Sequence, residues 1–466
     1  MKHKRKFSSK QFVIKTATVG LLLNMLASPA SSVVLADAVK TPATTETGTA
    51  ATGTATTKAA AAKIPSVESL GLNVSSAVLI EASTGEVLMS YNADQALPPA
   101  SMTKMMTEYL VTEAVNNGQL TWDQKVIVQE NASQQTGSRI YLAQGDEHTV
   151  KELYIAMAVG SANDATVALA ELVSGSEQQF VALMNETAQK MGMKTAYFIN
   201  STGLDRADMP AKYRPETDRE TVMSAMDAAL LAKYIVTDHP DFTDFTTIQS
   251  YKFRERDTKP MVNYNWMLEA NKDIANFKAY AYPGLDGLKT GHTSNAGNCF
   301  TGTAVRDGMR LISVVMGADS EAHRFTETKK VLDFGFNNFE IKQVVAAKSI
   351  LAGNETVPVD KGKKKTVPVV TDAGVTFIVP KGTVSPQIET AVTVNDASTL
   401  VAPIANATAV GKVTYTYKVE GMTQVQQKTV NLITAEEAEK AGWFKLLMRA
   451  IGDFFGDLFT GIKDLF

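Results

Sequence analysis

The sequence reads Ser101-Met-Thr-Lys104, then Ser161-Ala-Asn163 and, after a longer gap, Lys289-Thr-Gly291. The first stretch places a hydroxyl and an amine one helical turn apart, the second adds a hydroxyl and an amide, and the third adds another amine. A serine enzyme that transfers acyl groups without a catalytic histidine needs these groups. The three stretches therefore predict one active site, with Ser101 as its nucleophile, in a fold that joins distant segments.

The specificity of this signal comes from the order of the motifs. Ser-x-x-Lys and Lys-Thr-Gly each occur once, whereas Ser-x-Asn occurs twice, at Ser90 and at Ser161. Only Ser161 lies between the other two motifs. Taken alone, Ser101 is better explained as a serine that caps a helix, whereas Ser161 can cap the helix after it and be catalytic as well. The ordered set of three favours catalysis.

Ser101 is predicted to begin a helix. Pro98-Pro99 breaks the chain just before it, and apolar residues then recur at helical spacing. Asn116-Asn-Gly118 ends this helix. At a helix N-terminus the helix dipole favours developing negative charge, which suits a nucleophile in acyl transfer.

The second motif is predicted to lie between two helices. Thr149-Val-Lys-Glu152 is a capping box for a helix that runs to about Gly160, and another helix follows from Asp164. Ser161 and Asn163 then lie on a tight turn, which can direct both side chains into a cleft.

Alternating and apolar segments predict antiparallel strands both before and after these helices in the sequence. Asp307-Gly308 is a strong hairpin turn, and Ser83-Thr-Gly85 is the turn of an earlier hairpin. An antiparallel sheet with helices packed around it predicts an α+β fold. The expected strands are the hairpin 78–91 and the segments 287–293, 299–305 and 311–316.

Composition divides the chain ahead of its tail into four parts. Residues 1–36 combine a basic start, a short apolar stretch and small residues, which predicts a secretory signal peptide. Residues 37–63 are mostly Thr, Ala and Gly, which predicts a disordered linker. We place the catalytic domain at 64–338. A small all-β domain is expected at 339–435, where short alternating segments are separated by turn residues.

The tail, 436–466, is predicted to carry an amphipathic helix. From Trp443 onward apolar residues recur at helical spacing, and three basic and three acidic residues occupy the other side. We expect this helix to lie in a membrane interface and to bind mainly by apolar burial. The alternative is a helix docked on its own protein or on a partner. The apolar positions are Trp443, Leu447, Ala450, Ile451, Phe454, Phe455, Leu458, Ile462 and Leu465.

Composition also argues against several functions. The formal net charge of −3 becomes more negative once the basic segment 1–36 is removed, which argues against nucleic acid as a partner. The five histidines show no metal-ligand spacing and no glycine-rich phosphate loop is evident, so we expect neither a metal nor a cofactor. The single cysteine, Cys299, excludes an internal disulfide. It is expected to be a small buried side chain, with thiol-sensitive activity near Lys289 as the alternative.

With these features the chain resembles the D-alanyl-D-alanine carboxypeptidases among the penicillin-binding proteins of low molecular mass. The likeness covers the signal segment, the catalytic domain, the β-rich domain and the tail. One departure is Ala162, where related β-lactamases often carry aspartate. The matching motif neighbourhoods are Gly137-Ser138, Ser161-Ala-Asn-Asp-Ala165, Phe198-Ile-Asn-Ser-Thr-Gly-Leu204, and Asp286-Gly-Leu-Lys-Thr-Gly-His-Thr293 with Ala296-Gly297.

The resemblance implies a reaction. The substrate is expected to be a peptidoglycan stem peptide that ends in D-Ala-D-Ala, and β-lactam antibiotics are expected to acylate the same serine and leave slowly. Ser101 would attack the carbonyl of the penultimate residue, and Lys104 would take its proton as a neutral amine. Ser161 would relay a proton to the departing D-Ala, and Asn163 would orient Lys104 and the substrate amide.

The resemblance also implies a substrate-binding set. Lys289, Thr290 and Gly291 would bind the substrate. The backbone N–H groups of Ser101 and His292 would form the oxyanion hole. Arg324 matches the family position that meets the terminal carboxylate. An ordinary surface arginine is the alternative at that position.

Three other functions share part of this pattern. A class A β-lactamase would lack the β-rich domain and the tail, and would need a Glu-x-x-x-Asn loop where this chain has 198–204. A transpeptidase differs in using an amine instead of water as acceptor. A non-catalytic wall-binding protein is disfavoured by the intact Ser101, Lys104 and Lys289. The flanking segments predict an exported protein at the extracellular face of a bacterial membrane or in the cell wall.

Overall fold

The structure is a computed structural model that describes residues 64–419 and 425–463, with side chains of the last helix described as far as Phe455. The predicted signal peptide, 1–36, and the predicted linker, 37–63, lie outside the described residues. Both remain predictions.

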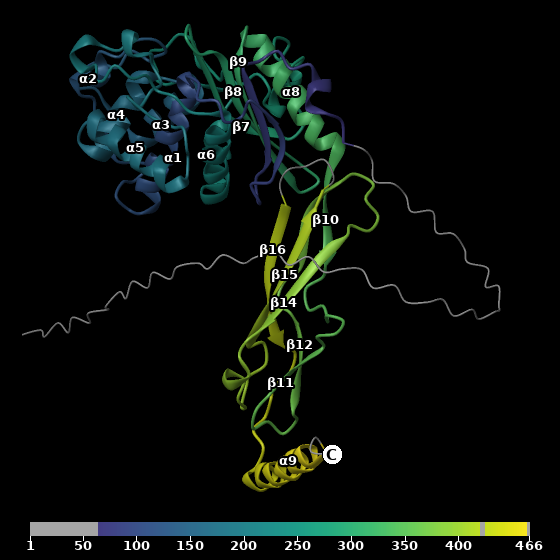
Figure 1. The fold of residues 1–466 in the computed structure, drawn as a ribbon. Coiled ribbons are helices and arrows are strands. Elements are labelled where there is room, and N and C mark those ends of the chain that lie inside the picture. The colour runs from purple at the N-terminus through teal and green to yellow at the C-terminus, as the bar shows by residue number, and fades with distance from the viewer. Residues whose placement is uncertain (1–63, 420–424, 464–466) are drawn as a thin grey trace, which may run out of the picture. The chain divides into compact units, whose positions relative to one another are not determined.

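The catalytic part is built on a five-stranded antiparallel sheet (Figure 1). The strand order is β2-β1-β9-β8-β7, so β7 lies at one edge. The expected hairpin 78–91 is formed by β1 and β2, and the three later predicted strands are formed as β7, β8 and β9. The strands are β1 (Ser76–Glu81), β2 (Val87–Tyr91), β7 (Leu285–Thr293), β8 (Gly297–Arg306) and β9 (Met309–Ala318).

Both faces of this sheet are covered by helices. Side chains alternate along β1, so Val78 and Ile80 pack in one apolar core and Leu79 packs in the other. Helix α6 (Ala225–Asp238) contributes to the first core and α8 (Glu321–Asn338) to the second. Figure 1 shows these two helices on opposite sides of the strands.

The helices between β2 and α6 position the first two motifs. The predicted capping box is present: Thr149 Oγ1 accepts a hydrogen bond from the Glu152 N–H, and the Glu152 carboxylate accepts one from the Thr149 N–H. The helices are α1 (Lys104–Asn116), α2 (Glu130–Ser133), α3 (Val150–Gly160), α4 (Asn163–Ser174) and α5 (Glu177–Met191). Shorter elements are β3 (Lys125–Ile127), β4 (Glu147–Thr149), α7 (Thr243–Thr246), β5 (Ser250–Tyr251) and β6 (Met261–Val262).

The start of the first catalytic helix differs from the prediction. Ser101 lies in a 3₁₀ turn, η2 (Ala100–Thr103), and the α-helix begins at Lys104. The cause is the tight turn after the two prolines, in which Ala100 has φ 49° and the Met102 N–H bonds to the Pro99 carbonyl. Ser101 is therefore held by the turn rather than by the helix itself.

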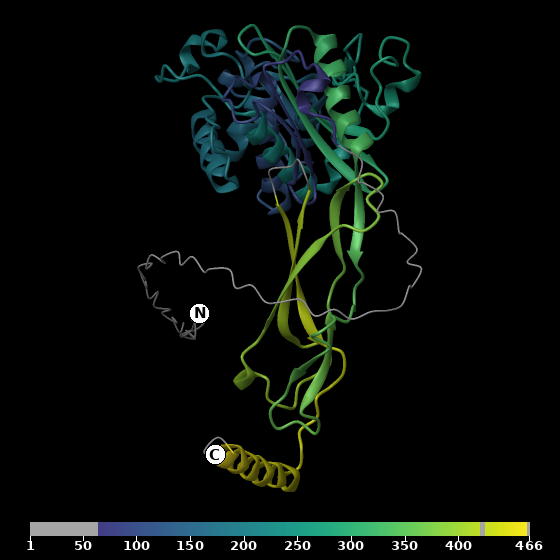
Figure 2. The ribbon, with the colours of Figure 1, turned by 45° about the vertical axis from the view of Figure 1, so that its right-hand side comes forward.

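From Phe339 onward the described residues form β-sheets. One five-stranded sheet has the order β11-β12-β16-β15-β14, and β10 pairs with β13. The long strands β15 and β16 run side by side in Figures 1 and 2. The predicted α+β class with a small all-β domain is confirmed. The strands are β10 (Phe339–Val345), β11 (Thr356–Pro358), β12 (Thr366–Thr371), β13 (Val375–Pro380), β14 (Ile388–Val394), β15 (Ala409–Lys418) and β16 (Val425–Thr434).

The last helix, α9 (Trp443–Lys463), begins at the residue from which helical spacing was predicted, after the predicted domain boundary at 436. Ala438 pairs with Ile404 and Lys440 with Gly362, so the start of the predicted tail continues the β-rich part. Seven large apolar side chains of α9 are exposed: Trp443, Phe444, Leu447, Met448, Ile451, Phe454 and Phe455. Among the described residues, no helix combines the length and apolarity that crossing a membrane requires.

Candidate active site

Lys104 is the centre of the site. Its side-chain nitrogen, Nζ, lies 3.1 Å from Ser101 Oγ, 2.6 Å from Asn163 Oδ1 and 2.7 Å from the Thr202 carbonyl. The side chain is fully buried. These three partners come from the turn before α1, from α4 and from a loop after α5, so they fix the amine from three directions. A buried amine held against a serine hydroxyl is the geometry of an activated nucleophile.

The second serine contacts the second lysine. Ser161 ends α3 in a left-handed conformation with φ 53°. Lys289 Nζ donates to Ser161 Oγ at 3.0 Å and to the Thr290 carbonyl at 3.2 Å. The structure thus brings the three sequence motifs together as two lysine–hydroxyl pairs.

The Asn163 amide is held on both sides. Its Oδ1 accepts from Lys104, and its Nδ2 donates to the Thr136 carbonyl at 2.7 Å. The Asn163 N–H bonds to the Ser138 carbonyl at 2.7 Å. This arrangement explains why the Gly137-Ser138 neighbourhood accompanies the motif: a Cβ added at Gly137, which has φ +71°, would lie 3.0 Å from Asn163 Nδ2.

The edge strand β7 lies against the turn that holds the nucleophile. A Cβ added at Gly291 would lie 2.5 Å from the Pro99 carbonyl oxygen and 3.1 Å from the Met102 nitrogen. Only glycine allows this approach. Thr290 is buried and His292 is exposed, with Nδ1 of His292 3.2 Å from the Gly297 carbonyl. The substrate-binding residues predicted on β7 therefore lie beside Ser101.

Arg324 lies on α8 behind β7. Its side chain is buried, 2% exposed as a residue, and Nη1 is 3.5 Å from the Gly291 carbonyl. Nη2 is 3.9 Å from a Glu321 carboxylate oxygen, and Nε has no partner among the described residues. The interpretation of Arg324 as an ordinary surface arginine is therefore wrong.

Burial sets the charge of the two lysines. Burial first, and then the charge of Lys289, lowers the pKa of Lys104 well below its ordinary value. Burial is also the main cause of the lowered pKa of Lys289, and Arg324 adds to the effect. Glu108 opposes both changes, because a negative charge favours the ammonium form. The depressed pKa of Lys104 supplies the neutral amine that a proton acceptor needs.

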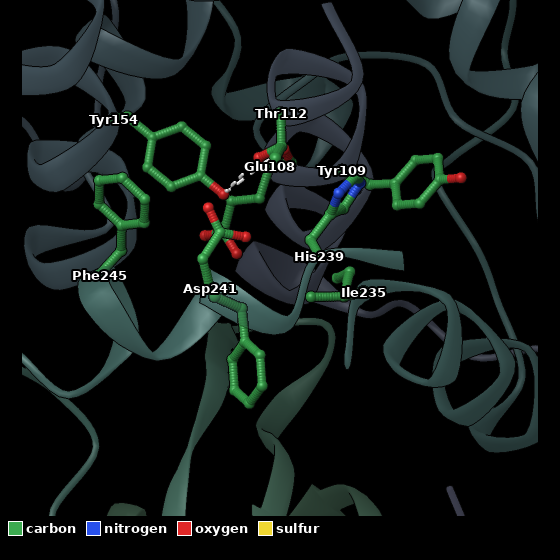
Figure 3. Close-up of a pocket in the computed structure, with 9 residues that line it drawn as sticks. Glu108, Tyr109, Thr112, Tyr154, Ile235, His239, Asp241 and Phe245 are labelled. Atoms are coloured by element: carbon green, nitrogen blue, oxygen red, sulfur yellow. Dashed lines mark hydrogen bonds between the residues drawn. The ribbon is translucent and has the colours of Figure 1, made fainter. Parts of the chain in front are cut away.

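No sequence motif indicated Glu108. It is nevertheless the buried carboxyl group that is closest to Lys104 along the sequence. It lies one helical turn further along α1 and is 3% exposed, and burial raises its pKa. Figure 3 shows its side chain beside Tyr154 and Asp241, where the Tyr154 hydroxyl bonds to Thr112. The cavity there has a volume of about 10 Å³ for the centre of a water-sized sphere, enough for one water molecule.

Two further residues of the site, Thr202 and Glu177, were not found from the sequence. The cysteine, Cys299, is buried as the sequence predicted. The Thr202 carbonyl is a backbone group, so no side-chain pattern could indicate it. Glu177 reaches the same loop from the start of α5. Cys299 is buried, and burial raises its pKa to about 11, so it remains a thiol.

Comparisons with known proteins agree with this geometry. The family model described as D-alanyl-D-alanine carboxypeptidase matches residues 59–320, and the model of the penicillin-binding protein 5 C-terminal domain matches residues 339–440. D-alanyl-D-alanine carboxypeptidase DacF of Bacillus subtilis (strain 168) is 34% identical over 385 residues, 83% of this chain and 91% of the relative. The DacD enzyme of Escherichia coli (strain K12) is 30% identical over 401 residues, 85% of this chain and 90% of the relative.

Solved structures show the same fold over both parts. A peptidoglycan synthesis regulatory factor from Streptococcus pneumoniae matches with a TM-score of 0.67 and 30% identity, covering 79% of this chain and 100% of that one. Penicillin binding protein 5 from Haemophilus influenzae matches with a TM-score of 0.62 and 30% identity, covering 79% and 98%. The chain therefore belongs to the D-alanyl-D-alanine carboxypeptidase family, the penicillin-binding proteins of low molecular mass.

Proposed function

We propose that this serine-type hydrolase removes the terminal D-alanine from peptidoglycan stem peptides through an acyl-enzyme on Ser101. The observation that carries the proposal is the 3.1 Å contact between Ser101 Oγ and a fully buried Lys104 amine. Family membership supplies the activity and supports binding of β-lactams. The geometry supports the assignment of roles.

Acylation begins with attack by Ser101. Neutral Lys104 accepts the hydroxyl proton while Oγ bonds to the carbonyl carbon of the penultimate D-alanine. The backbone N–H groups of Ser101 and His292 stabilise the oxyanion that forms. The C–N bond then breaks, Ser161 passes a proton to the departing amine, and Lys104 returns to its neutral form. Asn163 keeps Lys104 aligned through its 2.6 Å contact.

Deacylation uses water as the second nucleophile. Water attacks the ester carbonyl while Lys104 accepts its proton, the ester bond to Ser101 breaks, and Oγ regains the proton. A β-lactam follows the first half of this path, because its strained amide is attacked in the same way. Its leaving group stays attached to the acyl-enzyme, so water reaches the ester slowly.

Recognition of the terminal carboxylate is assigned to the cationic end of the site. Lys289 is buried beside Thr290, and Arg324 lies behind Gly291 with an Nε that has no partner among the described residues. Two cations at one end of the cleft favour an anionic peptide end over an uncharged one. Backbone groups of Gly291 and its neighbours on β7 then run along the substrate.

The β-lactamase alternative is disfavoured by the residues opposite Lys104. The loop that contains Asn200 and Leu204 presents the backbone carbonyl of Thr202 to Lys104 at 2.7 Å. A carbonyl accepts a hydrogen bond but cannot take a proton from the deacylating water, as a glutamate would. The transpeptidase alternative shares all these contacts, so only the acceptor distinguishes it.

We expect wild-type protein to convert a peptide ending in D-Ala-D-Ala into the product shortened by one residue, with an equal amount of free D-alanine. The assay is repeated with an added amino acid as a competing acceptor. Mass spectrometry of the peptide product then identifies the acceptor, since transfer to water gives a carboxylate and transfer to the amino acid gives an amide. The matched control is the same peptide ending in L-Ala-L-Ala, which should remain intact. A product that is mostly the amide at millimolar amine would contradict hydrolysis and favour a transpeptidase.

Export and membrane attachment belong to the same proposal. The predicted signal peptide, 1–36, would carry Ser101 across the membrane, to the extracellular face where wall precursors emerge. Helix α9 has seven exposed apolar side chains between Trp443 and Phe455. Such a helix lies in the membrane interface with this face among the lipid chains. Its position would keep the site close to newly exported stem peptides.

Truncation tests the attachment. A chain that stops after Gly442 keeps the pairing of Ala438 and Lys440 and loses α9 and the residues after it, with the hydrogen bonds from Arg449 to the Gly362 and Lys363 carbonyls. We expect it to leave the membrane fraction and the pellet of sedimented vesicles, while its activity on soluble peptide stays within about twofold. The matched single variants are Phe455→Glu on the apolar face, which should weaken vesicle binding, and Lys445→Gln on the polar face, which should not. Retention of the truncated chain on vesicles would contradict the attachment.

A further inference from the structure

Glu177 is a buried carboxylate outside the three motifs. It occupies the first position of α5 and is 7% exposed. Its Oε1 accepts from the Ser201 N–H at 3.0 Å and from Ser201 Oγ at 2.7 Å, and its Oε2 accepts from Asn131 Nδ2 at 2.9 Å. Three hydrogen bonds satisfy the charge that burial would otherwise make costly.

These bonds act on the loop that holds Lys104. Ser201 is followed directly by Thr202, whose carbonyl accepts from Lys104 Nζ at 2.7 Å. The Ser201 carbonyl accepts from Thr107 Oγ1 on α1 at 2.8 Å, so the loop is fixed against the same helix that begins with Lys104. Glu177 thus holds the residue next to Thr202, which itself contacts the proton acceptor Lys104.

The rest of the loop is held from within. Asn200 Oδ1 accepts from the N–H groups of Thr202 and Gly203 at 3.2 and 2.6 Å, and Asn200 Nδ2 donates to the Leu204 carbonyl at 2.8 Å. These contacts set the shape of the loop. Two described side chains anchor Ser201 from other elements: Glu177 accepts from its N–H and its hydroxyl, and Thr107 donates to its carbonyl.

We propose that Glu177 is a positioning residue that, through Ser201, holds the Thr202 carbonyl on Lys104 and so keeps the amine aligned with Ser101. This inference rests on the proposed role of Lys104 as proton acceptor. The neighbouring carboxylate Glu171, on α4, is half-buried with its Oε2 unpaired among the described residues, and burial and the charge of Glu177 raise its pKa to about 7.

The charge of Glu177 adds a second, measurable effect. Lys104 is faced by Lys289 from β7, by Glu108 from its own helix, by Asp164 from α4 and by Glu177 from α5. Burial and Lys289 lower the pKa of Lys104, and the three carboxylates raise it. Removing the charge at Glu177 therefore lowers the pKa of Lys104 further, whereas a change that affects only folding leaves it in place.

The test measures how the rate of acylation by a fluorescent penicillin depends on pH in the full-length chain. Rates are normalised to the amount of Ser101 that the penicillin labels at completion, which is the titrated serine. Glu177→Gln keeps the length and removes the charge, and we expect the midpoint of the pH profile to move to lower pH and the limiting rate to fall about tenfold. Glu177→Asp keeps the charge but withdraws the carboxylate from Ser201, and we expect the lower limiting rate with an unchanged midpoint. The matched control is Glu186→Gln on the same helix, an exposed partner of Lys190.

The outcomes separate this inference from the proposed function. A limiting rate and a midpoint within error of wild type in both variants would overturn the positioning role. A loss of thermal stability with wild-type rates per titrated serine would also overturn it, because it would leave Glu177 as a helix-start residue only. Absence of acylation in the wild type would instead refute the function on which the inference rests.

Discussion

Replacement of Ser101 by alanine is expected to abolish covalent labelling by a fluorescent penicillin and to lower the release of D-alanine by about 10⁴-fold or more. The hydroxyl is the group that Lys104 contacts at 3.1 Å, and Ser101 is only partly buried. Its loss therefore removes the nucleophile and leaves the packing of the turn almost unchanged. The measurement is gel fluorescence of the labelled chain together with a D-alanine assay.

The matched control is Ser90→Ala, which removes the serine of the other Ser-x-Asn sequence. Ser90 is exposed on β2, and we expect the variant to be labelled as the wild type is. Labelling that persists in Ser101→Ala would show that another residue is acylated. Rapid loss of label from the wild type would favour the β-lactamase alternative.

Replacement of Lys104 by alanine is expected to slow acylation by about 10²–10⁴-fold, the usual contribution of a positioned proton acceptor. The change also leaves Asn163 Oδ1 and the Thr202 carbonyl without their shared donor. The second variant, Lys104→Arg, introduces a permanent cation that cannot accept the serine proton, so it should be as slow as alanine. Stopped-flow or gel-based acylation rates measure both, with circular dichroism to show that each variant is folded.

The pH dependence of acylation in the wild type tests the same role of Lys104, because the role predicts the direction in which the rate changes. Only neutral Lys104 accepts a proton, and burial with the Lys289 charge holds its pKa well below the ordinary value. The acylation rate is therefore high above that depressed pKa and falls as the pH drops through it. Acylation that did not fall at any acidic pH at which the wild type stays folded, or that was unaffected in Lys104→Ala, would remove Lys104 from this role.

The sequence was sufficient for the parts of the site that depend on local spacing. Ser101 and Lys104 are neighbours on one turn, and the capping box at Thr149 correctly marked the start of the helix that ends just before Ser161. The order of the three motifs then implied their meeting, because a serine acyl transfer needs all of them. The alternation in the strands likewise predicted the antiparallel sheet on which Lys289 lies.

The supporting residues could not be predicted, for two physical reasons. The Thr202 contact is made by a backbone carbonyl, which every residue possesses. Glu108 and Glu177 are buried carboxylates, and the sequence alone indicates an exposed place for such residues unless their partners are known. Their partners come from segments far away in the chain, so only the fold reveals them.

Two glycines define how freely the backbone of the nucleophile can move. Gly203 has φ +81°, and a Cβ there would lie 1.9 Å from the Ala100 carbonyl oxygen, while Gly291 approaches the Pro99 carbonyl from β7. The main chain just before Ser101 is thus enclosed by two other segments. For inhibitor design this means that a compound must fit the backbone before Ser101 in the conformation it has in the structure, because the two glycine segments leave that backbone little room to move. For the evolution of resistance it means that a substitution at Gly203 or Gly291 would have to displace this turn, since a Cβ at either position would overlap the Ala100 or Pro99 carbonyl oxygen.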